Sequence, residues 1–186
     1  MEALTSNDVG EYAVARMKPS EAAKEQFEDL LKQHGGIIRK VAFGYARNES
    51  DRKDLMQDIL LQLWKTYPRY SPDRPFSTWM YRIALNVSIS YLRKHTRPGR
   101  ETVQFDESQH DIAPERPSAA KVEERLTMLQ QVMMKCPPLD RALLLLYLDD
   151  RSYREIASVL GLTETNVATK LSRLKERLRK ELTFNS

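Results

Sequence analysis

The chain has 186 residues, of which 41% are apolar and 30% are charged. This size and composition fit one ordinary domain or two small ones with a polar surface. The formal net charge is only +4, so the position of the charged residues must decide which partners bind. The single Cys136 excludes an internal disulfide and a multi-cysteine zinc site. The longest apolar run, Ala142 to Leu148, is far shorter than the roughly 20 residues that span a bilayer.

Residues 1–20 have no apolar period and no cationic start followed by an apolar stretch. They do not resemble a secretion signal, so we expect a cytoplasmic protein that begins with a frayed arm and inserts in no membrane. Helical periods dominate the rest of the chain, and no segment alternates convincingly like a strand. The sequence therefore predicts an all-α fold.

The first group of helices is expected between residues 21 and 96. Helical spacing begins at Glu21, is interrupted at Gly35-Gly36, and resumes until a third helix starts near Asp51. Two adjacent apolar stripes predict a wide buried face on the third helix: Leu55, Ile59, Leu63, Met56, Leu60 and Trp64. Three prolines between Tyr67 and Pro75 predict a loop, and a fourth helix follows from about Ser77 to Lys94.

The composition changes after the fourth helix. Residues 97–120 are rich in proline and acids and hold few large apolar side chains, which predicts a flexible acidic linker. The helical period returns at Lys121, and four further helices are expected up to about Leu182. The layout is thus two small helical domains, 21–96 and 121–186, on either side of the linker.

The last two helices have the pattern of a helix-turn-helix. Ser152 and Glu155 match a capping box, Gly161 suits a left-handed turn, and Thr163 can cap the second helix. The first helix is expected to bury four side chains: Tyr153, Ile156, Ala157 and Leu160. The second helix has an inward apolar stripe: Val167, Leu171, Leu174 and Leu178.

The opposite face of the second helix is polar and cationic, as recognition of the DNA major groove requires. It carries Asn166, Thr169, Lys170, Arg173 and Arg177. A plain helical hairpin with a solvated basic face would show similar charges. We favour DNA binding, because the spacing of Ala157, Gly161 and Val167 with a cap on each helix is more specific than a charge run.

The fourth helix resembles a surface for single-stranded DNA. Arg82, Asn86 and Arg93 share a stripe, and four aromatic residues lie just ahead of it or at its start: Tyr67, Tyr70, Phe76 and Trp79. Aromatic faces stack on unpaired bases, at about 1–3 kcal/mol per base, and cations hold the backbone. For Trp79, and for Tyr91 further along the same helix, packing in the core is an alternative at least equal to contact with a base. The loop position makes Phe76, Tyr67 and Tyr70 harder to bury, which favours a functional role.

The third helix carries an acidic stripe of Asp51, Asp54 and Asp58. The helix dipole explains acids in the first turn, but Asp58 lies deeper and favours a protein partner with a basic surface. No nucleophile–base pair, glycine-rich phosphate loop or metal-ligand spacing stands out, and the three histidines are scattered. We therefore expect neither an enzyme nor a cofactor or metal site.

Three segments together resemble bacterial sigma factors, the promoter-recognition subunits of RNA polymerase. Asp51 to Trp64 is similar to their polymerase-binding helix, and Phe76 to Arg93 to the segment that melts and recognises the −10 element. Ser152 to Gly161 is similar to the start of the helix-turn-helix that recognises the −35 element. Two such modules and no others resemble the extracytoplasmic-function (ECF) sigma factors, over about residues 21–182.

The resemblance implies three sets of site residues. Those expected to bind core polymerase, at the clamp coiled coil of its largest subunit, are Asp54, Gln57, Asp58, Leu61 and Trp64. Those expected at the −10 element are Tyr67, Tyr70, Phe76, Trp79, Arg82, Asn86, Arg93 and Lys94. Those expected at the −35 element are Glu164, Thr165, Asn166, Thr169, Lys170, Arg173 and Arg177.

The resemblance also implies further partners: the polymerase flap, promoter DNA and an anti-sigma protein that covers the polymerase-binding helix. Lys170 stands where many family members have arginine, which changes the expected −35 preference because lysine lacks the bidentate geometry. The leading alternative is a stand-alone helix-turn-helix regulator whose amino-terminal helices sense a ligand or dimerise. A purely structural adaptor is a third possibility.

Overall fold

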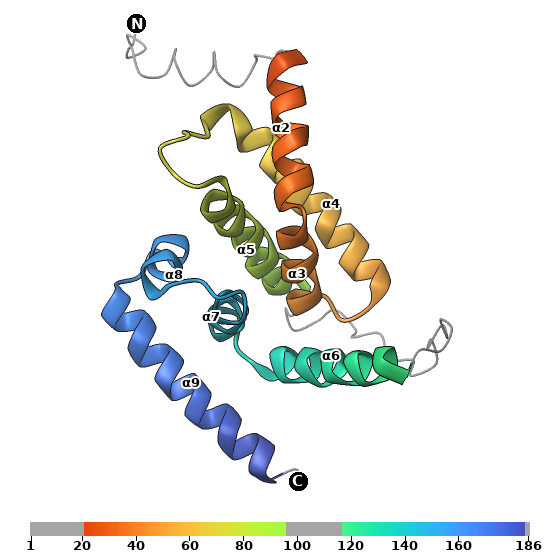
Figure 1. Cartoon of the computed structure of the whole chain (residues 1–186), viewed down its shortest axis with the longest axis vertical. Helices are drawn as coiled ribbons and strands as arrows, with labels where there is room; N and C mark the ends of the chain where they lie inside the picture. Colours follow the sequence, from red (N-terminus) through yellow and green to blue (C-terminus); the bar gives the residue numbers. More distant parts are fainter. Residues whose placement is uncertain (1–20, 96–116, 185–186) are drawn as a thin grey trace, which may run out of the picture.

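The computed structural model describes residues 21–95 and 117–184, which form helices without a strand (Figure 1). The all-α prediction is confirmed for these residues. The expected amino-terminal arm and most of the expected linker lie outside the described residues. The elements in chain order are α2 (Glu21–His34), α3 (Gly36–Tyr45), α4 (Glu49–Thr66), the 3₁₀ turn η1 (Tyr67–Arg69), α5 (Phe76–His95), α6 (Pro117–Lys135), α7 (Pro138–Leu148), α8 (Tyr153–Leu160) and α9 (Glu164–Phe184).

Two helices begin earlier than the sequence analysis expected. The side chain of Asn48 accepts a hydrogen bond from the backbone N–H of Asp51 at 2.7 Å, so α4 starts at Glu49. Helix α6 starts at Pro117, because proline has a fixed φ suited to the first position of a helix and needs no donor there. Placing residues 117–120 in the linker was therefore wrong.

We call residues 21–95 the first half and residues 117–184 the second half. Helices α3, α4 and α5 pack against one another and form the core of the first half. Leu55, Ile59 and Leu63 of α4 are fully buried, but Leu60 remains 36% exposed. The predicted wide buried face is therefore wrong in part: α3 and α5 cover one stripe of α4, and the neighbouring stripe extends to the surface. Met56 and Trp64 of that stripe are half-buried.

The apolar residues of α5 are divided between the core and the edge of the helix. Ile83, Val87 and Tyr91 share a stripe that is only half-buried. The core side chains of α5 are instead Phe76, Met80, Tyr81, Ala84, Leu85 and Ser88. The hydroxyl of Ser88 donates to the carbonyl of Ala84 at 2.8 Å, which satisfies this buried polar group.

In the second half, α7 is the central helix, with residues 141–146 buried between α8, α9 and the first half. Val167, Leu171 and Leu174 of α9 are buried as expected. Tyr153 is 38% exposed, which contradicts its predicted burial, and Val159 takes its place in the core. The short α8 has room for only one buried stripe, and the start of that helix lies at the surface.

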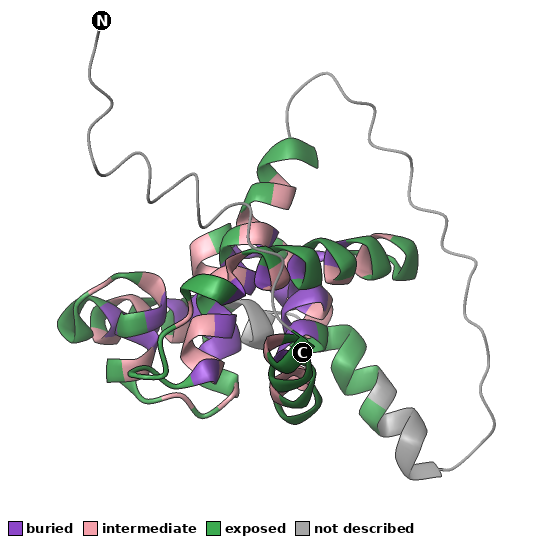
Figure 2. Ribbon diagram, turned by 90° about the horizontal axis from the view of Figure 1, so that it is seen from above, coloured by how far each residue is buried: buried purple, intermediate pink, exposed green. Residues whose placement is uncertain are grey.

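The two halves contact each other directly. Helices α6 and α7 pack on α3, while α7 and α8 pack on α5. Figure 2 shows buried residues on the inner faces of these helices and exposed residues around the outside. One apolar cluster runs from Phe27 in α2 to Leu174 in α9. Both helical groups predicted from the sequence are present, but their cores are continuous.

Candidate nucleic-acid interface

The helix-turn-helix has the predicted caps. The backbone N–H of Glu155 donates to the Ser152 hydroxyl oxygen at 3.3 Å, and the Ser152 N–H donates to the Glu155 carboxylate at 2.9 Å. Gly161 has φ +68°, in the left-handed region, and ends α8. The Thr163 hydroxyl oxygen accepts from the N–H of Asn166 at 3.2 Å and caps α9. These local bonds determine where α8 begins and ends and where α9 begins.

Substitution Ser152→Ala is expected to lower the free energy of unfolding by about 1 kcal/mol, because α8 loses its N-terminal cap. The Ser152 hydroxyl and backbone amide lower the pKa of Glu155. This stabilisation is therefore present at neutral pH and is lost as the pH falls through the lowered pKa. Urea unfolding of both proteins at pH 7 and at acidic pH measures the difference.

The control is Ser158→Ala, at an exposed position of the same helix. Its free energy of unfolding should stay within about 0.5 kcal/mol of wild type, as for ordinary surface substitutions. Equal losses in the two variants would contradict the capping role of Ser152.

Helix α9 presents the predicted recognition face. Val167 and Leu171 point into the core, and the opposite side is open to solvent. The exposed residues of that side near the helix start are Glu164, Thr165, Asn166, Thr169 and Arg173. Lys170 is half-buried beside them. Arg177 differs, because it donates to the Asp140 carboxylate of α7 at 2.8 Å and so holds α9 against α7.

The expected polymerase-binding residues of α4 form an exposed stripe. Asp54, Gln57, Asp58 and Leu61 are all exposed, and Leu61 keeps 51% of its surface. Trp64 is half-buried because its ring packs on Phe27, with 5.1 Å between ring centroids. Leu60 borders the stripe and was missed, since its spacing matched a buried position. An acidic surface with exposed leucines suits a partner that offers both cations and apolar contacts.

The aromatic residues around the turn after α4 form a cluster. Tyr67 is 8% exposed and Phe76 5%, so the expectation that a loop position keeps these rings available is wrong. The 3₁₀ turn directs Tyr67 inward onto the Phe27 ring, at 4.8 Å between centroids. Tyr70 and Trp79 are half-buried and lie 5.2 Å apart between ring centroids.

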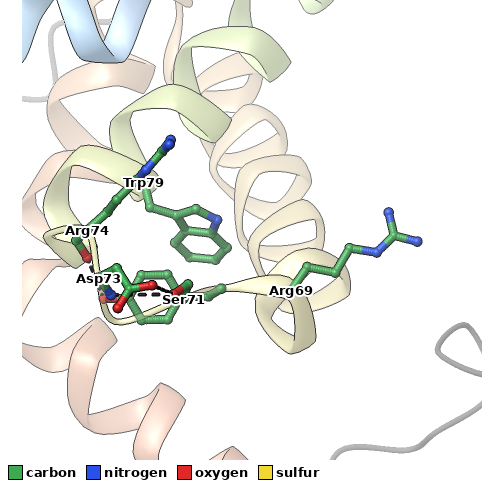
Figure 3. Close-up of a pocket in the computed structure, with 6 residues that line it drawn as sticks. Arg69, Ser71, Asp73, Arg74 and Trp79 are labelled. Atoms are coloured by element: carbon green, nitrogen blue, oxygen red, sulfur yellow. Dashed lines mark hydrogen bonds between the residues drawn. The ribbon is translucent and has the colours of Figure 1, made fainter.

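An open cavity of about 300 Å³ lies beside this cluster (Figure 3). Its lining residues are Arg69, Tyr70, Ser71, Asp73, Arg74 and Trp79. The Ser71 hydroxyl donates to the Asp73 carboxylate at 2.6 Å, and the Tyr70 hydroxyl donates to the Arg74 carbonyl at 2.9 Å. These two bonds hold the turn, so that the Trp79 and Tyr70 rings and the polar residues Ser71 and Asp73 line one hollow.

The resemblance also implies that the loop 67–75 forms a pocket for a flipped −10 base, but four of the lining residues were not among the individual site residues, namely Arg69, Ser71, Asp73 and Arg74. Their signal was only the proline-rich loop itself, and the loop had to be folded before they came together. Trp79 lies above the turn in Figure 3, whereas Arg69 extends away from it. An aromatic face with polar groups around it can stack on an unpaired base and form hydrogen bonds to its edge.

The cationic stripe of α5 is divided in the structure. Asn86, Arg93 and Lys94 are exposed and available for a ligand. Arg82 instead donates to the backbone carbonyl of Ser158 in α8 at 2.5 Å. Arg82, which was predicted to contact DNA, therefore takes part in a contact between the two halves.

No group of His, Cys, Asp or Glu in residues 21–95 and 117–184 is arranged to hold a metal ion. Among the same residues, no helix combines the length and apolar character that crossing a membrane requires.

Two helical modules with an exposed recognition helix in one and an aromatic pocket in the other define a bipartite DNA-binding protein. Residues 30–98 match sigma-70 region 2, and residues 126–178 match sigma-70 region 4. Together the matches cover more than half of the chain, in the expected order. The chain belongs to the sigma-70 family, within its ECF sigma factors.

Several relatives have names of this class. "ECF RNA polymerase sigma factor SigE" of Mycolicibacterium smegmatis is 26% identical over 89% of this chain, which spans 65% of SigE. "ECF RNA polymerase sigma factor SigW" of Bacillus subtilis is 27% identical, with 86% of this chain and 90% of SigW covered.

Two solved structures share the fold. CnrH, in complex with the cytosolic domain of CnrY, aligns with a TM-score of 0.65 and 24% identity, over 94% of this chain and 96% of CnrH. RpoE from Bartonella quintana, in complex with the anti-sigma factor NepR, aligns with a TM-score of 0.67 and 18% identity, over 87% of this chain and 99% of RpoE.

Proposed function

We propose that this chain binds core RNA polymerase and directs it to promoters, with no chemical step of its own. The observation that carries the proposal is the order of two sigma regions, each with its expected surface exposed: the acidic stripe of α4 and the polar face of α9. A stand-alone regulator is not favoured, because region 2 occupies the segment that would have to sense a ligand or dimerise. The function places the chain in the cytoplasm, with the polymerase.

The α4 stripe is the proposed site for core polymerase. Asp54, Gln57 and Asp58 project from one exposed side of a helix whose other side is fixed by Leu55 and Ile59. We assign this stripe to the clamp coiled coil of the largest subunit, and the second half to the flap. Complementary charges at this site would increase the rate of association with polymerase more than the affinity.

The pocket at the start of α5 is the proposed site for an unpaired base of the −10 element. Trp79 and Tyr70 would stack on the base, and Asp73 and Ser71 offer hydrogen-bond partners for its edge. Buried Tyr67 and Phe76 would support the pocket without touching the base. Extraction of a base costs a few kcal/mol, which these contacts would have to offset.

Substitution Asn86→Ala is expected to reduce promoter opening by about tenfold or more while leaving closed-complex binding nearly unchanged. Asn86 is exposed on α5, and its amide can form hydrogen bonds to the Watson–Crick edge of a base, which pairing occupies in the duplex and flipping makes available. Permanganate footprinting measures opening, and gel-shift assays with a duplex promoter measure the closed complex. Ser90→Ala, an exposed change one turn further on, is the control. Equal loss in both assays would exclude strand capture by Asn86.

An anti-sigma protein is a further proposed partner. The structures of CnrH and RpoE were solved with CnrY and NepR, respectively, and both proteins share this fold. We assign the partner's site to the exposed α4 stripe, so that polymerase and inhibitor compete for it. A competition pull-down with core enzyme would test this assignment.

Run-off transcription with purified core enzyme and a genomic promoter library tests the function as a whole. Addition of the chain should produce transcripts with defined start sites that core enzyme alone does not produce. A chain that binds a specific duplex tightly as a dimer, without polymerase and without new transcripts, would support the regulator instead.

A further inference from the structure

The Asp149 carboxylate bonds to residues from both halves of the chain. Asp149 caps the end of α7, and its side chain is only 13% exposed. One carboxylate oxygen accepts from the ammonium group of Lys40 in α3. The other accepts from the Tyr81 hydroxyl of α5 at 2.6 Å and from the Arg151 guanidinium at 3.3 Å. We call Asp149, Lys40, Tyr81 and Arg151 the Asp149 network.

The Asp149 network is charged at neutral pH. Burial alone would raise the pKa of Asp149, but the hydrogen bonds from Lys40 and Tyr81 outweigh it and the net pKa is lowered. Burial, and then the bond to Asp149, raise the pKa of Tyr81, so its hydroxyl stays protonated and donates. Arg151 also lies over the Tyr81 ring, 5.3 Å from its centroid. Hydrogen bonds to a charged group are stronger than those between neutral groups.

Further polar contacts cross the same boundary, including one from the Gln130 amide of α6 to the carbonyl of Ala46 at 3.1 Å. The guanidinium of Arg141, 5% exposed, donates to the carbonyl of Gly44 near the end of α3 at 3.3 Å. The Tyr45 hydroxyl donates to the carbonyl of Pro138 at 2.7 Å. The halves are thus joined by directional polar bonds as well as by apolar packing.

The same arrangement restricts the proposed DNA-binding surfaces. Arg82 is bonded to α8 through Ser158, and α9 follows α8 after a short turn. The −10 and −35 elements lie about 25 base pairs apart, or about 85 Å along the duplex. With α8 directly on α5, this closed arrangement does not let the two halves contact both elements.

We propose that the Asp149 network is an autoinhibitory latch, which holds the two halves closed and must break before the chain engages a promoter. The proposal rests on the proposed function. When a binding-competent state is only a fraction of the population, the apparent affinity is reduced by that fraction. A weaker latch therefore increases promoter engagement without changing any residue proposed for DNA contact.

Three variants weaken the closed arrangement in different ways. Asp149→Asn removes the charge at the centre of the latch, and Lys40→Gln removes one cation at a side chain that is 55% exposed. Gly44→Gln acts by packing, because a Cβ at Gly44 would lie 2.7 Å from the Met133 Cε and 3.2 Å from the Leu145 Cδ1. Glutamine favours the helix more than glycine, so α3 itself is not weakened.

The matched control is Asp150→Asn. It is the same chemical change one residue away, at an exposed side chain. Asp150 has φ +54°, a left-handed conformation that asparagine tolerates well. It should therefore behave as wild type in every assay.

The distance between the halves is measured on the full chain by double electron–electron resonance. Spin labels are attached at cysteines that replace the exposed Lys65 and Ser172, with Cys136→Ala in all proteins. Wild type and Asp150→Asn should give one short distance. The three latch variants should add longer distances, with the open-to-closed ratio raised about tenfold, the effect typical of losing a hydrogen bond to a charge. Circular dichroism checks that each variant remains folded.

Promoter affinity is then measured with core polymerase and unlabelled protein. The apparent dissociation constant of the latch variants should fall by up to the same tenfold factor. The latch proposal would be overturned if the wild type were already mostly open. It would also be overturned if the Lys40→Gln and Gly44→Gln variants were folded and gave unchanged distances. If the variants opened but kept the promoter affinity of wild type, the Asp149 network would be a structural contact without an autoinhibitory role. The distance measurement needs no polymerase, so failure of the proposed function would be seen separately, as the absence of promoter-specific transcripts from wild type.

Discussion

Substitution Asp58→Lys is expected to abolish co-purification with core polymerase, with a loss of affinity of about a hundredfold or more. Asp58 is exposed near the middle of the α4 stripe, between Asp54 and Leu61. A lysine there places a cation against a basic partner surface, and a mismatched charge in an interface costs several kcal/mol. The helix itself should tolerate the change, since lysine is a good helix former and the position is solvated. Pull-down with core enzyme and circular dichroism measure the two effects.

The control for this prediction is Glu28→Lys. It has the same change of charge at an exposed position of α2, outside the α4 stripe. Its affinity for core enzyme should stay within about threefold of wild type, as expected where a charge acts only over a distance and is screened by salt. If both variants lost binding alike, the effect would reflect net charge, and the assignment of α4 as the polymerase site would fail.

The double substitution Lys170→Ala and Arg173→Ala is expected to weaken −35 binding by about ten- to hundredfold. Arg173 is exposed and Lys170 is half-buried at the edge of the same face of α9, where the helix would enter the major groove. Each cation that neutralises a phosphate releases counterions, so two lost contacts should flatten the slope of log K against log salt by about 1.8. Fluorescence anisotropy of the polymerase complex on −35 duplexes, across a salt series, measures both quantities.

Lys24→Ala with Lys32→Ala removes the same charge from α2, where both lysines are exposed and paired with neighbouring acids. This control should leave the salt slope unchanged. A double variant of α9 that loses affinity with an unchanged slope would place base contacts, and not phosphate contacts, at these positions. An unchanged affinity would remove α9 from the interface.

Features that depend on a few neighbouring residues were predictable from the sequence. The Ser152–Glu155 capping box, the left-handed Gly161 and the Thr163 cap all formed as expected. Each involves groups within about four residues, so the energetics are decided before the chain folds further. The inward stripe of α9 was equally predictable, because its spacing allows only one buried face.

The candidate sites were only partly predictable. The exposed stripe of α4 and the outer face of α9 lie where the sequence analysis placed them. Tyr67 and Phe76 were expected to contact bases and are instead buried, since only the folded turn shows that Phe27 from α2 meets the Tyr67 ring. The pocket residues Asp73 and Arg74 were expected only as members of the loop 67–75, because nothing in their spacing distinguished them from the other residues of that loop.

The sequence by itself determined the approximate positions of the helices, the caps of α8 and α9, the family of the chain and which side chains of α4 and α9 face the solvent. Only the tertiary structure decided the partners of individual cations and acids. Arg177 binds Asp140, Arg82 binds Ser158, and Lys40 binds Asp149, across separations of 37, 76 and 109 residues, respectively. Periodicity can tell which side of a helix is buried, but it contains no information about which distant side chain will lie opposite.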